Sequence, residues 1–101
     1  MKRALIIASN DNVASALENI AAGEKVEARL GKKVVSLLAR EEVPFGFKIA
    51  LKEIPKGGDV VKYGEVIGKA SAAIAEGSLV HIHNVEGARG RGDLVKGGMT
   101  P

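Results

Sequence analysis

A short pattern occurs three times in the chain and limits what it can fold into: an isoleucine, a glycine three residues later, and a valine three residues after that. The copies are Ile20/Gly23/Val26, Ile54/Gly57/Val60 and Ile74/Gly77/Val80. The isoleucine can anchor the chain in a core, the glycine permits the positive φ of a tight corner, and the valine suits the start of a strand. Repeated corners of this kind predict a small, clip-like β domain.

Aromatic residues are too few to fill a large core, so the packing must rest on small aliphatic side chains. The 101 residues include three aromatic ones, Phe45, Phe47 and Tyr63, whereas hydrophobic residues of all kinds make up 46% of the chain and charged residues 27%. This balance is typical of a globular protein, and the length suits one domain. We predict an α+β fold that is mainly β, with one short helix, shaped as a small barrel.

The helix is expected near residues 12–22. Residues 9–12 are Ser, Asn, Asp and Asn, whose short side chains cap the free N–H groups of a first helical turn. Gly23 follows, where a left-handed residue often ends a helix. The apolar residues that recur at helical spacing are Val13, Ala16, Leu17 and Ile20.

Extended structure is predicted for the other apolar segments. Residues 4–8 form a short apolar run that fits a first strand, and residues 26–30 and 34–38 flank a Gly-Lys-Lys turn, which predicts a β-hairpin. Residues 48–54 suit either a strand or one helical turn, and we favour the strand.

The sequence excludes several classes of protein. It has no cysteine, so disulfides and thiolate sites are absent, as is typical of a reducing cytoplasm. No apolar stretch reaches the roughly 18 residues of a membrane span, and a net charge of +3 is small for a nucleic-acid-binding protein. We expect a cytoplasmic protein that binds neither membranes nor nucleic acid, and the sequence leaves homo-oligomers open.

The two histidines of the chain, His81 and His83, are predicted to share one face of a strand, because residues 79–84 alternate in character. Together they can chelate a metal ion, with a third ligand from Asp11, Glu65 or a partner chain. They can instead recognise a carboxylate or a hydroxyl group. As a third role, one can bond to the backbone while the other meets solvent.

Two lysines stand close to glycines in segments that can line the rim of a small barrel. Lys48 follows Gly46, and Lys62 precedes Gly64. Their ammonium groups can meet the carboxylate of a sugar acid, although most lysines are merely solvated.

Residues 89–101 are predicted to be a flexible, basic, glycine-rich tail that follows a domain of residues 1–88. Arginine and glycine alternate in this tail without the interleaved aromatic residues of RNA-binding tracts. We expect the tail to dock onto a partner protein through Arg89, Arg91 and Asp93, the second interpretation being a solvated tail.

Four phrases of the sequence occur together in a characteristic order. They are Asp11-Asn12-Val13-Ala14, the run from Gly46 to Leu51, Lys62-Tyr63-Gly64-Glu65, and Val80-His81-Ile82-His83-Asn84, the last followed by Arg89-Gly90-Arg91. Their order and spacing resemble the N-terminal domain of altronate and galactarate dehydratases over nearly the whole chain. That domain is of the SAF type, so the resemblance implies a β-clip fold.

The resemblance also implies an activity. In that family the domain is fused ahead of a large catalytic domain or encoded as a small subunit, as in sulfolactate sulfo-lyase-like pairs. Such enzymes eliminate water or sulfite from a 2-hydroxy acid and are commonly dependent on Fe²⁺, which we expect mainly on the large subunit. Because the chain ends where a fusion would continue, we expect a separate, non-catalytic subunit, inactive without its large partner.

Six residues match phrases of that family, and the resemblance implies that they help to bind or close over an anionic sugar acid. One departure is Phe47, which stands where many relatives carry histidine and can neither bind a metal ion nor transfer a proton. This departure argues against the chain as the source of a catalytic base, or indicates a different substrate. The six matching residues are Lys48, Lys62, Tyr63, His81, His83 and Asn84.

A second function is compatible with the same residues. A stand-alone module that binds sugar acids without chemistry needs no catalytic set, and the sequence contains no nucleophile elbow, phosphate loop or helix-borne zinc motif. Ligand binding by the isolated chain would distinguish this module from a subunit. An assembly protein is a third and more remote reading.

Overall fold

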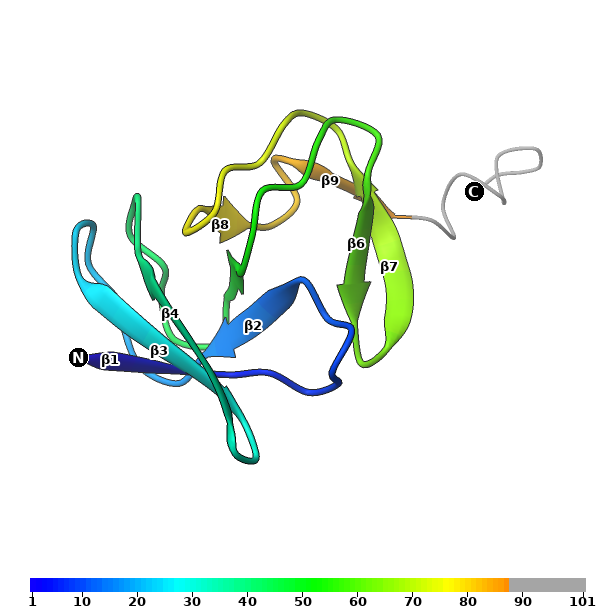
Figure 1. Cartoon of the computed structure of the whole chain (residues 1–101). Helices are drawn as coiled ribbons and strands as arrows, with labels where there is room; N and C mark the ends of the chain where they lie inside the picture. The colour runs from blue at the N-terminus through cyan, green and yellow to red at the C-terminus, as the bar shows by residue number, and fades with distance from the viewer. Residues whose placement is uncertain (88–101) are drawn as a thin grey trace.

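The computed structural model describes residues 1–87, which form two β-sheets (Figure 1). The strands of the larger sheet are β1 (Lys2–Leu5), β2 (Val13–Ala16), β3 (Lys25–Leu30), β4 (Lys33–Leu38), β5 (Lys48–Ala50) and β8 (Leu79–Val80). Those of the smaller sheet are β6 (Asp59–Lys62), β7 (Glu65–Ala70) and β9 (Val85–Gly87). The order is β4-β3-β1-β2-β5-β8 in the larger sheet and β6-β7-β9 in the smaller one. Only β1 and β3 pair in parallel among these strands.

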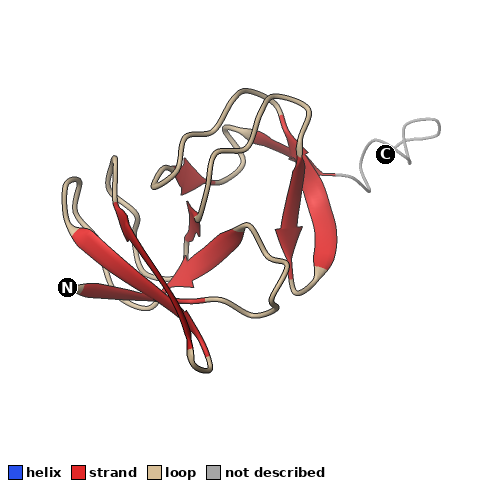
Figure 2. Cartoon of the chain, in the orientation of Figure 1, coloured by secondary structure: helices blue, strands red, loops and turns tan. Residues whose placement is uncertain are grey.

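The predicted helix at residues 12–22 is wrong, because residues 1–87 contain no helix (Figure 2). Val13–Ala16 form β2 instead, which pairs with β1 on one side and with β5 on the other. Three of its four residues are buried. A central strand that is covered on both faces carries a continuous run of apolar residues, and such a run can also match helical spacing. The fold is therefore all β over the described residues, not α+β.

The other predicted elements are found close to their expected places. The first strand begins and ends slightly earlier than residues 4–8, and the predicted hairpin is formed by β3 and β4. Within 48–54, the favoured strand is present as β5, although it covers only Lys48–Ala50. No helix among residues 1–87 has the length and hydropathy of a membrane span.

The three predicted corners are present, and the structure contains a fourth with the apolar residues exchanged: Val43, Gly46 and Ile49. The corner glycines all have φ between 83° and 86°. The apolar residues on either side of each glycine are no more than 2% exposed. These residues are Ile20, Val26, Val43, Ile49, Ile54, Val60, Ile74 and Val80.

Each corner is closed by the same contact with a buried alanine of another segment. The glycine N–H donates to the alanine carbonyl at 2.8–2.9 Å, and the alanine N–H donates back to the chain one residue beyond the glycine. The pairs are Gly23 with Ala39, Gly46 with Ala16, Gly57 with Ala70, and Gly77 with Ala50. The carbonyl that accepts the returning hydrogen bond belongs to Glu24, Phe47, Gly58 and Ser78, respectively. All four corners therefore have the same hydrogen-bond pattern.

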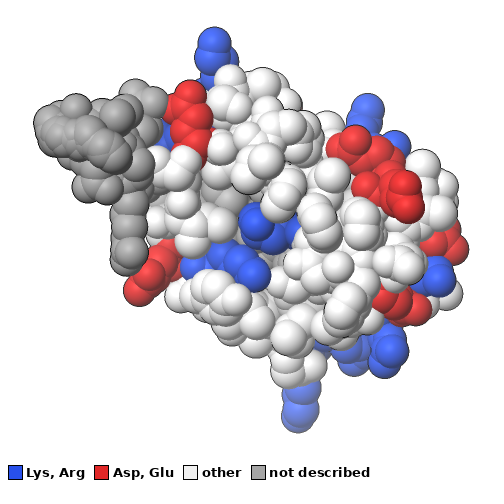
Figure 3. Space-filling view, turned by 180° about the vertical axis from the view of Figure 1, so that it is seen from behind, with Lys and Arg blue, Asp and Glu red and all other residues white. Residues whose placement is uncertain are grey.

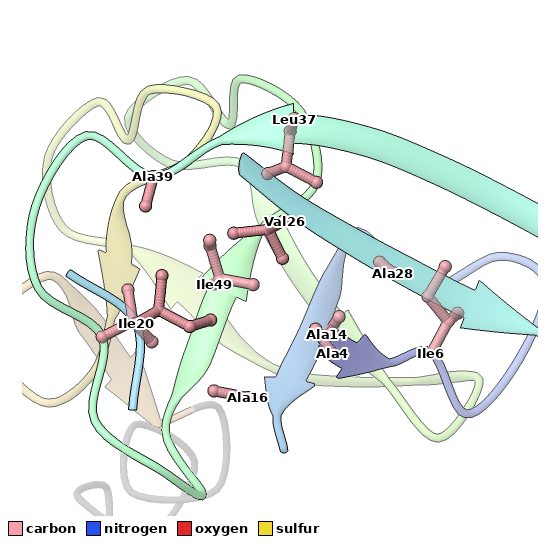
Figure 4. Packing of buried hydrophobic residues seen from close by; sticks show 11 residues of the cluster. Ala4, Ile6, Ala14, Ala16, Ile20, Val26, Ala28, Leu37, Ala39 and Ile49 are labelled. Atoms are coloured by element: carbon pink, nitrogen blue, oxygen red, sulfur yellow. The ribbon is translucent and has the colours of Figure 1, made fainter. Parts of the chain in front are cut away.

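The corners come in two pairs, and each pair encloses a core. A bridge between Ile20 and Val43 joins the first two corners, and a bridge between Ile54 and Ile74 joins the last two. The first core contains eleven buried residues, of which Ile20, Val26 and Ile49 are grouped between the strands in Figure 4. The second core contains seven, including Val60. Deleting one of these isoleucine side chains to alanine typically costs about 2–5 kcal/mol of stability.

Candidate anion-binding site

A buried carboxylate joins the loop between β1 and β2 to the hairpin of β6 and β7. Asp11 is only 8% exposed. One carboxylate oxygen, Oδ1, accepts the N–H of Gly64 at 2.8 Å, and the other, Oδ2, accepts those of Ala8 at 2.9 Å and Tyr63 at 3.2 Å. Burial raises the pKa of this carboxyl, but the backbone hydrogen bonds outweigh burial, so the pKa of Asp11 is lowered from its ordinary value of 3.8. Asp11 is therefore charged in the folded protein at neutral pH.

The adjacent Asn12 fixes β6 against the larger sheet. Its Oδ1 accepts the N–H of Val61 at 2.8 Å, and its Nδ2 donates to the carbonyl of Asp59 at 2.8 Å. Its backbone N–H also donates to the carbonyl of Val61 at 3.2 Å, while its own carbonyl accepts the N–H of Leu51. Asn12 therefore links β6 with the end of β5, the strand that carries the first lysine of the site.

The hairpin held by Asp11 has an unusual residue at its tip. Lys62 pairs with Glu65, so the loop contains only Tyr63 and Gly64, with φ values of 58° and 73°. Positive φ at both central residues defines a type I′ turn, in which Asn-Gly is strongly preferred. Tyr63 is the one residue other than glycine with positive φ within residues 1–87. Its backbone is strained, and the residue is 60% exposed.

Lys62 contacts this tyrosine, and Lys48 lies close enough for the charge of Lys62 to affect its pKa. Lys62 donates from Nζ to the Tyr63 hydroxyl oxygen at 3.2 Å, and its Nζ lies 4.5 Å from the centroid of the tyrosine ring. Lys48, half-buried at the start of β5, has a lowered pKa because of burial and because of the positive charge of Lys62, with Tyr63 acting in the opposite direction. Figure 3 shows groups of basic atoms side by side near the middle of one face.

The histidines are arranged differently from the prediction. The strand expected over residues 79–84 is wrong, because β8 ends at Val80 and the chain turns, with the N–H of Asn84 donating to the carbonyl of His81. Alternation along a strand therefore does not align the two imidazoles. His83 is exposed, whereas His81 is half-buried with its ring centroid 4.7 Å from that of Phe47. His81 follows Val80, the partner of Lys48 in the sheet, and so lies beside the lysine site.

Asn84 is engaged in holding this turn together. Its Oδ1 accepts the N–H of His81 at 2.9 Å, and its Nδ2 donates to the carbonyl of Leu79 at 2.8 Å. Both ends of its side-chain amide thus contact the backbone of its own turn. Its visible role is to orient His81, and the predicted contact of Asn84 with substrate stays a prediction.

The described part of the chain does not offer a complete metal site. Within residues 1–87 no three side chains of His, Cys, Asp or Glu lie together in a way that can hold a metal ion. Asp11, considered from the sequence as a third ligand, is occupied by backbone N–H groups. Metal binding by His81 and His83 stays a prediction that needs ligands from elsewhere. The predicted docking residues Arg89, Arg91 and Asp93 lie outside the described residues.

Lys48, Lys62 and Tyr63 are candidates from the sequence alone, but the residues that position them are not. Asp11 and Asn12 are important because they contact residues that follow them by 47 to 53 positions in the sequence. Local sequence patterns do not reveal such contacts. One signal was available, since Tyr-Gly between two apolar runs can be recognised as a type I′ turn that needs help.

Comparison with known proteins points to one family of enzymes. Residues 2–88 match the family model described as the altronate/galactarate dehydratase SAF domain. Altronate dehydratase of Bacillus subtilis (strain 168) is 38% identical over 86 residues, which are 85% of this chain and 16% of that protein. Altronate dehydratase of Escherichia coli (strain K12) is 47% identical over 74 residues, which are 73% of this chain and 14% of that protein.

A shorter relative is similar over most of its own length. The alpha subunit of (2R)-sulfolactate sulfo-lyase of Paracoccus pantotrophus is 42% identical over 53 residues, which are 52% of this chain and 79% of that subunit. The chain thus spans a small part of the altronate dehydratases and most of the sulfo-lyase subunit.

Proposed function

The chain belongs to the altronate/galactarate dehydratase SAF domain family, and from this premise we propose that it acts beside a large catalytic chain in a lyase. The lyase eliminates water or sulfite from a 2-hydroxy acid. The observation that carries the proposal is the contact of Lys62 with Tyr63 at a turn that Asp11 holds in a strained conformation. The half-buried Lys48 of β5 adds a second positive charge, close enough to Lys62 for each to affect the other. The sulfo-lyase relative, named as a subunit, supports the division into a small and a large chain.

The chemistry of such an elimination explains why the site is basic. A proton leaves the carbon beside the carboxylate, and the leaving group departs from the neighbouring carbon with its bonding electrons. Negative charge grows on the carboxylate as the proton leaves, so nearby cations stabilise the transition state more than the ground state. Lys48 and Lys62 bind and orient the carboxylate in this proposal, and the Tyr63 hydroxyl donates a hydrogen bond to a substrate oxygen.

Neither the base nor the metal is assigned to this chain. Phe47 occupies the position where the family resemblance leads one to expect histidine, and its ring packs on His81. The Fe²⁺ that the family implies finds no complete ligand set within residues 1–87, so we place it on the large chain and derive no step through it here.

The test is elimination activity on altronate, galactarate and sulfolactate in the presence of ferrous iron. This chain, its candidate large partner and the mixture of both are assayed in parallel. We expect turnover only in the mixture, and a KM about tenfold higher for Lys48→Met, as the loss of a charge-assisted hydrogen bond predicts. Lys56→Met, an exposed lysine at the third corner, is the matched control and should leave KM unchanged.

Two results would contradict the proposal. Full turnover by the large chain alone would remove any need for this subunit, and an unchanged KM for Lys48→Met would place the substrate elsewhere. His83→Ala in the same mixture tests whether the exposed histidine turn also contributes to substrate binding, since it removes the imidazole while leaving the Asn84 hydrogen bonds in place.

A stand-alone binding module is the second candidate. It is favoured by the fact that both lysines and the tyrosine come from this chain, so the site does not depend on a partner for its charged groups. Calorimetric titration of the isolated chain with galactarate separates the two functions. Tight binding without a partner, together with no turnover in any mixture, would favour the module.

A further inference from the structure

The larger sheet ends in a long strand that has no neighbour on its outer side within residues 1–87. β4 pairs with β3 over six residues without a register shift, and it is the last strand in the order of this sheet (Figure 1). The other edge strands are less accessible: β8 has two residues, β9 has three, and β6 is irregular and bonded to Asn12. Proteins commonly protect a long edge with a proline or a bulge, and residues 33–38 have neither.

Backbone hydrogen-bonding groups point outward from this edge at alternate residues. Just after β4, Ala39 donates its N–H to the carbonyl of Glu24, which continues the ladder between β3 and β4. In an antiparallel ladder every second residue bonds to the neighbouring strand, so the odd-numbered residues of β4 bond to β3. The N–H groups that face away from β3 are those of Val34, Ser36 and Leu38.

A groove of about 640 Å³ follows the second half of the same edge. The consecutive residues 36–40 line it, so the edge of the strand is accessible from the groove. Apolar side chains are exposed there, since Leu38 is 55% exposed and Met1, which also lines the groove, is 71% exposed. An accessible strand edge beside apolar side chains is the arrangement to which an extended segment adds as a new strand, held by main-chain hydrogen bonds.

The charges beside this edge favour an acidic partner. Lys32 and Lys33 stand at the beginning of β4, whereas Lys25 and Arg40 line the groove at its end. All four are exposed, and none of them forms an ion pair within residues 1–87. Glu76 is the acidic residue among those that line the groove, so basic residues outnumber it. A strand with acidic residues near both of its ends would complement these charges.

A second copy of this chain fits the edge less well than an acidic strand does. Two β4 strands paired antiparallel about Ser36 would set Lys32 of each copy opposite Arg40 of the other. Like charges would then meet twice, and like charges directly opposite each other destabilise a pair of strands. The edge therefore favours a different chain over a copy of itself.

The beginning of β4 also lies beside the loop that supports the candidate site. Lys33 donates from Nζ to the carbonyl oxygen of Ser9 at 3.3 Å. Two residues later in this loop, Asp11 accepts the N–H groups of Tyr63 and Gly64. A chain that pairs with β4 therefore comes next to the loop that holds the strained turn, as the catalytic partner of the site must.

We propose that the large catalytic chain adds an extended segment to the outer edge of β4 and so continues the larger sheet. The segment carries apolar residues at alternate positions and acidic residues near its ends. This inference rests on the proposed function, because it names the surface through which this chain meets the large chain.

Amide hydrogen exchange of the unaltered chain tests the proposal without any variant. In the free chain, the N–H groups of Val35 and Leu37 should exchange slowly and those of Val34 and Ser36 quickly. Addition of the candidate large chain should slow exchange at Val34 and Ser36 about tenfold or more, because a bonded N–H exchanges only when its bond opens. Mass spectrometry with residue-level fragmentation measures each site. Unchanged exchange at both residues in a complex that forms would overturn the proposal.

A proline variant tests the same hydrogen bonds through affinity. Ser36→Pro removes one outward N–H, and an edge strand tolerates proline where that N–H faces solvent, so the chain should still fold. The dissociation constant for the large chain, measured by calorimetry, should rise about tenfold or more, since a carbonyl of the added segment loses its donor. Ser36→Ala keeps the N–H, is the matched control and should leave the constant unchanged.

Charge reversal tests the chemistry of the partner. Arg40→Glu should weaken association with the large chain several-fold, and the loss should shrink at high salt, because exposed charges are screened. Lys56→Glu reverses an exposed lysine at the third corner, away from β4, and should leave association unchanged. Tighter association for Arg40→Glu would contradict the acidic ends assigned to the segment.

The outcomes separate this inference from the function that it deepens. A complex that forms and turns over equally well with Ser36→Pro would overturn strand addition and leave the subunit role standing. Self-association of this chain that Ser36→Pro abolishes, with binding of the large chain unaffected, would assign the edge to a second copy and overturn the proposal. Absence of any complex and of turnover in every mixture would overturn both proposals.

Discussion

Two hairpins of the molecule have two-residue turns, but different residues form them. The β3–β4 hairpin turns through Gly31 and Lys32, and only Gly31 has positive φ, at 59°. A glycine at this place has no Cβ to clash, so the turn forms without outside support. The β6–β7 hairpin turns through Tyr63 and Gly64 and places a bulky side chain where the backbone disfavours it.

The difference in support follows from the difference in residues. The N–H groups of Tyr63 and Gly64 both donate to the buried carboxylate of Asp11, whereas the β3–β4 tip has a single exposed contact, from Lys33 Nζ to the carbonyl of Ser9 at 3.3 Å. The strained turn is also the one that presents Lys62 and the tyrosine ring. Strain maintained by surrounding structure is typical of functional sites, which is why we propose the substrate site at the β6–β7 hairpin.

The largest effect is expected from removing the support. Asp11→Ala leaves three N–H groups without their acceptor, two of them in the strained turn, and should lower the free energy of unfolding by about 3 kcal/mol. Urea denaturation measures this loss. Lys33→Ala in the other hairpin is the control, and it should cost less than about 0.5 kcal/mol. Similar losses in both variants would contradict the contrast between the hairpins.

Protonation of Asp11 by acid should weaken its hydrogen bonds to the β6–β7 turn less than Asp11→Ala does, because a protonated carboxyl still accepts hydrogen bonds. The folded pKa of Asp11 is below its ordinary value of 3.8, so its contribution is complete above that value. The contribution is lost as the pH falls through the folded pKa. We expect Asp11→Asn to flatten the acid side of the stability curve, measured by thermal unfolding between pH 2 and 5. An unchanged slope would show that other carboxyls govern acid unfolding.

Local sequence patterns predicted the hairpin and the corners but failed where a residue acts over long distances. Ser9 to Asn12 have the composition of a helix cap, yet Asp11 caps a turn that lies more than 50 residues later. The fourth corner does not match the repeated pattern, because Val43 and Ile49 exchange the order of isoleucine and valine. Only the common alanine contact reveals that it has the same design.

The candidate site was predicted in its members and not in its geometry. Lys48 and Lys62 were named from separate phrases, and nothing in the sequence places β5 near β6, which Asn12 joins. The histidine strand failed for a physical reason, because Asn84 satisfies the backbone of a turn and ends β8 at Val80. Alternating residues do not distinguish a strand from a turn of this length.

A smaller effect should follow from relieving the strain in the β6–β7 turn. Asparagine tolerates positive φ better than tyrosine, so Tyr63→Asn should raise the free energy of unfolding by about 0.5–1 kcal/mol. The same variant loses the hydroxyl that meets Lys62 and should weaken galactarate binding several-fold. Gain in stability and loss of affinity are measured on one sample by thermal unfolding and calorimetry. A loss of stability would show that the tyrosine ring stabilises the turn more than its backbone strains it.

The smallest effect concerns Lys48, the lysine of the site that β5 carries. The pKa of Lys48 is lowered by burial and by the charge of Lys62, so the folded protein holds its proton less firmly than the unfolded chain does. The free energy of unfolding then rises as the pH increases from the folded pKa of Lys48 toward 10.5, the ordinary value. Below the folded pKa, the cost of the charged lysine is present in full. Lys48→Met should therefore stabilise the protein at pH 7 by less than about 0.5 kcal/mol, because solvent screens a half-exposed charge. The gain should shrink at pH 10, whereas Lys56→Met should give no gain at either pH. Destabilisation by Lys48→Met at neutral pH would show that the lysine has an internal counter-charge. Lys48 would then not share the unfavourable energy of the strained β6–β7 turn.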